Sequence, residues 1–196
     1  MKKTLFILAL ACLSFAAVKA QDASVIWAMD TPVEEPQAAV VSGKLQNPEL
    51  KFFELQANDN GAEETYARVC MLGKDNWTMK EAGHIYFEFS IEPQAGATFV
   101  FKNVSFSLAG WSTNEMKTGI YYSKSADFSD KKQLPFKVNE YLKHSEFEPA
   151  DINVTPMEIA PGERLYFRFY PYLASDVPDD SKYIVVKDFR IKGTIK

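Results

Sequence analysis

Tyrosine and arginine alternate near the C-terminal end of the chain, in the segment Leu-Tyr-Phe-Arg-Phe-Tyr-Pro-Tyr. In an extended strand, Tyr166, Arg168 and Tyr170 point to one side, and Tyr172 follows just beyond Pro171. Sugar rings stack on aromatic planes, and an arginine fork pairs with a uronic-acid carboxylate or with vicinal hydroxyls. These residues therefore predict a carbohydrate-binding stripe. The same residues are equally suited to a structural stack or salt bridge at a sheet rim.

Two tryptophans lie in segments that have the composition of loops. Trp111 follows a glycine and precedes Ser-Thr-Asn, and Trp77 lies between an asparagine and a threonine. An exposed loop tryptophan is unusual enough to suggest recognition, so both join the predicted carbohydrate-binding residues. The alternative is that either ring folds back over an edge of the core. Trp27 lies in an apolar run and is expected in the core.

Enzymatic chemistry is a further alternative for the same tyrosine–arginine stripe. A polysaccharide lyase needs a tyrosine or histidine base and an arginine or asparagine that neutralises the uronate carboxylate. Tyr166, Arg168 and Tyr170, with His84 or His144, are residues of the right types. The chain contains no nucleophile elbow, no P-loop and no dinucleotide-binding glycine motif. The sequence thus predicts a protein without catalytic residues, and a small lyase is the least favoured function.

Metal and cofactor motifs are sparse. The two histidines are sixty residues apart and have no zinc-ligand spacing around them. The acidic loops at residues 58–64 and 176–180 could hold structural calcium, but neither has the spacing of an EF-hand. Cys70 lies beside Val69 and Met71 and is expected to be a buried small hydrophobe. We therefore predict no cofactor, with calcium as the single alternative.

The first twenty residues have the pattern of a secretory signal peptide. A Met-Lys-Lys start precedes a nearly continuous apolar run, and small residues at Val18 and Ala20 precede Gln21. We expect cleavage near Ala20 and a protein that is secreted, periplasmic or at the cell surface. No later apolar run reaches the roughly 18 residues of a spanning helix. With a formal charge of −4 and no basic cluster, the chain is not expected to bind nucleic acid.

Strand patterns dominate the rest of the 196 residues, 46% of which are hydrophobic. Alternation is clearest from His84 to Glu92 and from Glu163 to Tyr170. Residues 133–147 have no clear period, and a short helical turn is the only helix allowed for. The expected strands lie at 25–30, 50–56, 64–72, 84–92, 98–108, 119–123, 151–159, 163–170 and 182–195, the last one kinked near Lys187. About nine strands at roughly ten-residue spacing predict an all-β sandwich or barrel. Residues 21–196 are expected to form one domain.

Four segments of this pattern resemble a known family. They are Tyr-Phe-Glu-Phe-Ser-Ile-Glu-Pro from Tyr86, Ile-Tyr-Tyr-Ser from Ile120, Ala-Pro-Gly-Glu-Arg-Leu-Tyr-Phe-Arg-Phe-Tyr-Pro-Tyr from Ala160 and Ile-Val-Val-Lys-Asp-Phe-Arg-Ile-Lys-Gly from Ile184. Together they resemble a β-sandwich module of secreted Bacteroidetes proteins, which often accompanies pectate lyases and other polysaccharide-degrading domains. The resemblance implies a two-sheet antiparallel β-sandwich of jelly-roll type, similar to carbohydrate-binding modules. It also implies an accessory role in polysaccharide utilisation, with Arg168, Tyr170 and Pro171 as signature positions.

Three functions follow as expectations. The first is a secreted, non-catalytic carbohydrate-binding module that captures a polysaccharide or other glycan. The second is a surface structural or protein-interaction domain without a glycan ligand, in which the tyrosine–arginine stripe is covered by another subunit or strand. The third is the small polysaccharide lyase. Fold alone does not choose among them, and the sequence leaves the oligomeric state open.

Overall fold

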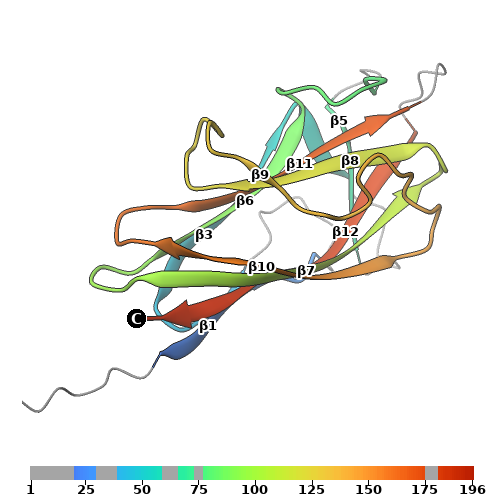
Figure 1. Cartoon of the computed structure of the whole chain (residues 1–196). Coiled ribbons are helices and arrows are strands. Elements are labelled where there is room, and N and C mark those ends of the chain that lie inside the picture. Colours follow the sequence, from blue (N-terminus) through green and yellow to red (C-terminus); the bar gives the residue numbers. More distant parts are fainter. Residues whose placement is uncertain (1–19, 30–38, 59–65, 73–76, 175–180) are drawn as a thin grey trace, which may run out of the picture.

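The computed structural model describes residues 20–29, 39–58, 66–72, 77–174 and 181–196. Within these ranges the regular elements are strands, which form two antiparallel sheets (Figure 1). The two sheets share a hydrophobic core. The predicted all-β, two-sheet antiparallel sandwich is confirmed, whereas the jelly-roll type remains a prediction. The strands are β1 (Gln21–Trp27), β2 (Val40–Ser42), β3 (Leu45–Phe53), β4 (Leu55–Asn58), β5 (Ala67–Met71), β6 (Tyr86–Pro93), β7 (Phe99–Trp111), β8 (Met116–Ser123), β9 (Lys132–Gln133), β10 (Glu148–Ile159), β11 (Leu165–Leu173) and β12 (Tyr183–Ile195).

Strand β12 lies at the centre of the seven-stranded sheet, whose order is β10-β7-β12-β1-β2. One end of β12 pairs with β5, which in turn pairs with β4, and the other end pairs with β1. A register shift separates the two halves at Asp188, whose φ is 54°, so the kink expected near Lys187 is confirmed. Lys187 pairs with Ser107 and Arg190 with Ser105. Because the bulge adds a residue, both cations point to the same outer face.

Strand β11 is central to the five-stranded sheet, whose order is β3-β6-β11-β8-β9. Its neighbours β6 and β8 place Glu88 and Tyr121 on either side of Arg168. The strand expected at 163–170 extends further than predicted, because β11 continues through Pro171 to Leu173. The proline pairs with Thr118 of β8 and lies beyond Phe169, the last residue of β11 that pairs with β6, so no ladder bond is lost on that side.

The core between the sheets is rich in aromatic rings. Phe189 of the seven-stranded sheet stacks on Phe89 of the five-stranded sheet, with ring centroids 4.0 Å apart. Trp27, fully buried as expected, lies 5.1 Å from Phe89 and 5.8 Å from Phe189. The alternation read from the sequence explains this packing, because the apolar faces of β6, β7 and β11 all point inward.

Several expectations at the level of elements are settled by the described residues. Residues 134–147 contain turns and bends and no helix, so the short helical turn allowed for there is wrong. Cys70 is buried, as expected. Tyr122 points into the core and Tyr121 points outward, in line with their opposite faces. The proposed signal peptide and most of the two acidic loops considered for calcium lie outside the described residues.

Candidate functional site

The predicted stripe on β11 lies on the outer face of the five-stranded sheet. Tyr166, Arg168 and Tyr170 alternate with Leu165, Phe167 and Phe169, which are all fully buried in the core. The common face of the stripe is therefore confirmed. Its availability to a ligand is a separate question, which the partners of each side chain answer.

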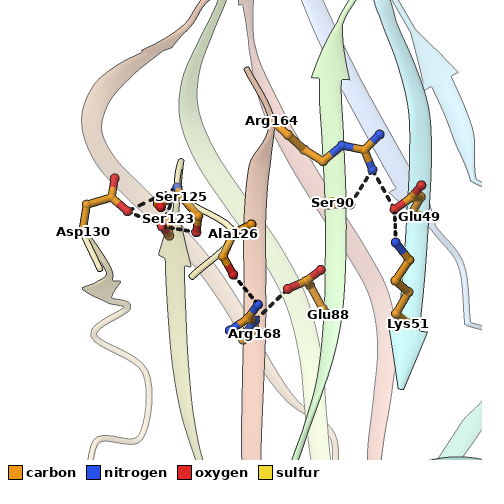
Figure 2. Close-up of polar contacts among 10 residues, drawn as sticks. All are labelled: Glu49, Lys51, Glu88, Ser90, Ser123, Ser125, Ala126, Asp130, Arg164 and Arg168. Carbon is orange, nitrogen blue, oxygen red and sulfur yellow. Dashed lines mark hydrogen bonds and ion pairs between the residues drawn. The ribbon is translucent and has the colours of Figure 1, made fainter. Parts of the chain in front are cut away.

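Arg168 is held on every side by its own chain. Its Nε donates to Glu88 Oε2 at 2.6 Å, and one terminal nitrogen donates to the Ala126 carbonyl at 2.7 Å (Figure 2). Its guanidinium carbon lies 4.3 Å from the centroid of the Tyr86 ring and 3.9 Å from that of Phe128. Only 13% of the side chain is exposed. The fork is thus used for a buried ion pair and two cation–π contacts, so the structural role foreseen as the alternative is the one the geometry supports.

The loop of residues 124–131 provides the cover over Arg168. Two carboxylates fold this loop: Asp130 accepts hydrogen bonds from the Ser123 hydroxyl and the Ser125 amide, and Asp127 accepts from the Ser125 hydroxyl and the Ser129 amide. These hydrogen bonds, led by that of Ser125, lower the pKa of Asp127 to about 2. The fixed loop buries Phe128 against the stripe. The stripe is therefore covered by a segment of the same chain.

Charged neighbours of the stripe are paired as well. Arg164 contacts Glu49 Oε2 at 2.7 Å and donates to the Ser90 hydroxyl at 3.1 Å (Figure 2). Lys51 contacts the same Glu49 oxygen at 2.6 Å. Lys51 and Arg164 lower the pKa of Glu49, with the Lys51 hydrogen bond as the largest cause. This end of the outer face is a network of satisfied charges.

Tyr170 and Tyr172 lie under the segment of residues 77–85, which crosses the outer face. Tyr170 is only 4% exposed, and Tyr172 is half-buried, which raises the pKa of both phenols. The segment places the Glu81 carboxylate directly over Gly119, where the Tyr121 hydroxyl donates to it at 3.2 Å. Leu173 N also donates to the Thr78 carbonyl at 3.0 Å. Tyr170 is therefore part of the packing, and Tyr172 is the only one of this pair with notable exposed surface.

Trp77 was expected to be an exposed loop residue, and that expectation is wrong. Its side chain is 4% exposed and belongs to the core cluster. The indole nitrogen donates to the Lys182 carbonyl at 3.0 Å. The ring therefore anchors the segment before β6 to the start of β12. Trp77 folds back over the core, which was the other reading of its loop position.

Trp111 has a different environment. It is the last residue of β7, so it ends a strand and does not lie in a loop as its sequence neighbours suggested. It stands on the outer face of the seven-stranded sheet, directly across from Tyr183 of β12, and is half-buried. Of the six predicted binding residues, Trp111 is the one that lies among other aromatic side chains on the outer face of the seven-stranded sheet.

Four further side chains join Trp111 in a group that we call the Trp111 cluster: Tyr66, Arg68, Phe147 and Tyr183. The Tyr66 ring lies 5.1 Å from Trp111 and 5.5 Å from Phe147. The Arg68 guanidinium carbon lies 4.7 Å from the Trp111 ring centroid and 5.5 Å from that of Tyr183. All five side chains are half-buried, so each keeps some exposed surface.

The sheet register explains why these residues meet. Ala109 and Val185 are opposite each other in β7 and β12, and Val185 is opposite Arg68 in β5. Ala109 and Val185 are both fully buried and point outward, so they form a flat floor beneath the larger side chains. His144, whose ring lies 6.3 Å from Trp111, borders the cluster and is exposed. The arrangement combines aromatic planes, a guanidinium and an imidazole on one open surface.

Sequence reasoning missed four of the five members of this cluster. The predicted strand at 64–72 contains the alternation that puts Tyr66 and Arg68 on the face opposite Val69 and Met71. That pattern alone could have marked an aromatic–arginine pair. The pairing of this strand with β12, more than a hundred residues away, has no signal in a single sequence.

Metal chemistry receives no support from the described part of the chain. There, no group of three or more histidine, cysteine, aspartate or glutamate side chains is placed to hold a metal ion. His84 is exposed and lines an open, mainly apolar depression of about 600 Å³ formed by residues of the 77–85 segment. Among the described residues, no helix has the length and apolar character that crossing a membrane would require.

Comparisons with known proteins place no constraint on the site. No protein-family model matches the chain, and no curated protein matches its sequence. The interpretation of the site therefore depends on its own geometry.

Proposed function

We propose that this protein is a secreted, non-catalytic carbohydrate-binding module whose glycan lies against the Trp111 cluster. The observation that carries the proposal is the half-buried group of Trp111, Tyr66, Phe147 and Tyr183 around Arg68 on the outer face of the seven-stranded sheet. Aromatic planes of this kind accept the C–H faces of sugar rings. The signal-peptide pattern of residues 1–20 supports secretion, and the resemblance to polysaccharide-associated modules supports the class of ligand.

The β11 stripe, in contrast, supports a scaffold role. A ligand at Arg168 would have to displace Glu88, Ala126 and Phe128 together. Displacing Glu88 would leave a carboxylate without its partner on a side chain that is only 7% exposed, which is costly. The lyase alternative loses its neutralising arginine for the same reason, since Arg168 is already paired.

The proposal is tested by native affinity electrophoresis of the purified protein against pectin, alginate, xylan, β-glucan and glycosaminoglycans. We expect retardation by at least one polymer and a loss of about ten-fold or more in affinity for Trp111→Ala, since an aromatic anchor contributes upwards of about 1.4 kcal/mol. The matched control is Tyr141→Ala, which removes a 48% exposed aromatic outside the cluster and should leave affinity unchanged.

Three outcomes would contradict the proposal. Equal retardation of the parent protein and Trp111→Ala would remove the Trp111 cluster as the site. No retardation by any polymer would favour the alternative of a structural or protein-interaction domain. Retardation that fades as the polymer shortens would instead revive the lyase.

A further inference from the structure

A line of cations follows the outer face of β12 beyond the Trp111 cluster. Lys187, Arg190 and Lys192 are each half-buried. Their cross-strand neighbours in β7 are Ser107, Ser105 and Asn103, which carry no charge. Whereas Arg164 and Arg168 are paired with carboxylates, the structure gives these three cations no side-chain hydrogen bond or ion pair with any residue that it describes. Because none of the three has a carboxylate partner among the described residues, they add uncompensated positive charge to this face of an acidic chain.

The bulge in β12 produces this alignment. Lys187 and Arg190 have opposite parity in the sequence, so in a regular strand they would point to opposite faces. The register shift at Asp188 brings both opposite outward-facing serines of β7. The same shift keeps Phe189 and Ile191 in the core. The chain thus uses one irregular residue, with φ of 54°, to place Arg190 and Lys192 on the face that carries Tyr183 and Trp111.

An open depression of about 350 Å³ lies at the cationic end of this face. Strands β1 and β2 border it, because Ser24 pairs with Lys192 on one side and with Ser42 on the other. Hydroxyls and cations therefore surround the depression, with Asp22 as its one acidic member. The lining residues are Asp22, Ala23, Ser24, Ser42, Arg190, Lys192 and Gly193. Such a lining offers several hydrogen-bond donors to an anionic group.

We infer that the ligand of this sheet face is an acidic polysaccharide, which runs along β12 from the Trp111 cluster to the depression at Arg190 and Lys192. The inference rests on the proposed function and adds the charge class of the glycan. Tyr183 and Lys192 are nine positions apart, a span of about 30 Å in an extended strand, which suits a chain of several sugar units. The aromatic end stacks on sugar rings, and the Arg190 fork and Lys192 ammonium pair with carboxylate or sulfate groups.

Isothermal titration calorimetry of the purified protein tests the inference with three probes: polygalacturonate, dextran sulfate and neutral xylan. The first two separate carboxylate from sulfate as the anionic group. We expect affinity for one acidic polymer to fall with added salt and to fall about ten-fold or more in the Arg190→Gln/Lys192→Gln variant, because two charge-assisted contacts are lost. The charge-matched control, Lys80→Gln/Lys132→Gln, removes two exposed cations elsewhere and should change affinity less than about two-fold.

The outcomes separate this inference from the proposed function. Binding of neutral xylan alone, dependent on Trp111, would overturn the acidic ligand and leave the carbohydrate-binding module standing. Acidic-polymer binding that survives Arg190→Gln/Lys192→Gln would also overturn the inference. Binding that depends on Arg190 and Lys192 but is unchanged in Trp111→Ala would support the cationic site and overturn the Trp111 cluster as the glycan platform. No binding of any probe would overturn both.

Discussion

Arg168 and Glu88 form a buried ion pair in which each charge compensates the other for its loss of contact with water. Their side chains are 13% and 7% exposed, and they are joined at 2.6 Å between the two rings that cover the guanidinium. Removing the arginine alone leaves a buried carboxylate with no counter-charge. Removing both partners leaves no buried charge at all. The pair therefore contributes to stability in a way that only paired substitutions reveal.

The first prediction concerns this pair. Arg168→Met should lower the free energy of unfolding by about 3–5 kcal/mol, whereas Arg168→Met/Glu88→Gln should be less destabilised than Arg168→Met alone. Lys51→Ala, which removes an exposed ion pair with Glu49, serves as control and should cost about 1 kcal/mol or less. Urea denaturation of the four proteins measures the differences. A double variant less stable than Arg168→Met would argue against the buried pair as the cause.

The tyrosines of the same face predict sensitivity to alkali. Burial, with the Glu81 carboxylate as the next cause, raises the pKa of Tyr121 to about 12. Burial also raises the pKa of Tyr86 and Tyr170. An unfolded tyrosine ionises near pH 10, so between about pH 10 and 12 the unfolded state loses a proton that the folded state keeps. The free energy of unfolding is therefore highest below pH 10 and falls as the pH rises through this window.

Tyr121→Phe tests this second prediction. The variant removes one of the ionising groups, so its free energy of unfolding should fall less steeply than that of the parent protein above pH 10. Urea denaturation from pH 8 to about 11.5, with tyrosinate absorbance recorded alongside, gives both quantities. An unchanged slope in Tyr121→Phe would show that Tyr121 ionises in the folded protein as freely as in the unfolded chain.

At the scale of elements, the pairing of β7 with β12 determines which residues share the outer face. Two register shifts interrupt this pairing, one at Asp188 and one where Gly193 takes Phe101 as its partner. At the second shift the strands approach so closely that a Cβ on Gly193 would lie 2.1 Å from the Val100 carbonyl oxygen. Only glycine fits this approach, because the obstructing atom belongs to the backbone.

The third prediction follows from that contact. Gly193→Ala should destabilise the protein by about 1–3 kcal/mol, since either β7 or β12 must move to admit the methyl group. Gly83→Ala is the matched control, because a Cβ there meets no atom within 4 Å, and it should change stability by less than about 0.5 kcal/mol. Thermal unfolding of the two variants compares them. Equal melting temperatures would contradict this prediction, because they would show that β7 and β12 admit the methyl group without loss of stability.

The strand pattern could be predicted from sequence wherever alternation is local. The inward faces of β6, β7 and β11 were expected from residues such as Phe87, Val104 and Phe167, and all are buried. The strand expected at 50–56 is divided between β3 and β4, which the sequence did not predict. Phe53 and Leu55 belong to different sheets, and Glu54 between them has a φ of 54°. A change of sheet is decided by long-range pairing, which leaves no local signal.

The candidate site illustrates the same limit at the scale of the whole molecule. Arg168 and its neighbouring tyrosines were recognised as residue types that bind sugars. Glu88 and Phe128, which pair with and cover Arg168, are 80 and 40 positions away from it in the sequence. Trp111 was recognised without its partners Tyr66 and Tyr183, which reach it only through the pairing of β5, β12 and β7. Residue type can be read from the chain, whereas availability depends on which side chains the fold brings together.

The two sheets accordingly differ in what their outer faces present. The five-stranded sheet carries paired charges and tyrosines covered by the 77–85 segment and the 124–131 loop. The seven-stranded sheet carries the Trp111 cluster, three unpaired cations among its described residues and an open depression. We therefore propose that a ligand binds on the face of the seven-stranded sheet and that the face of the five-stranded sheet has a structural role.

Chemical-shift mapping of the backbone amides during titration with an acidic polysaccharide tests this assignment most directly. We predict perturbations along β12, at the end of β7 near Trp111 and on β5 around Arg68, with β11 unaffected at Arg168. Perturbations confined to β11, β6 and the 124–131 loop would contradict the account, because they would show that the ligand opens the Arg168 site and leaves the Trp111 cluster unused.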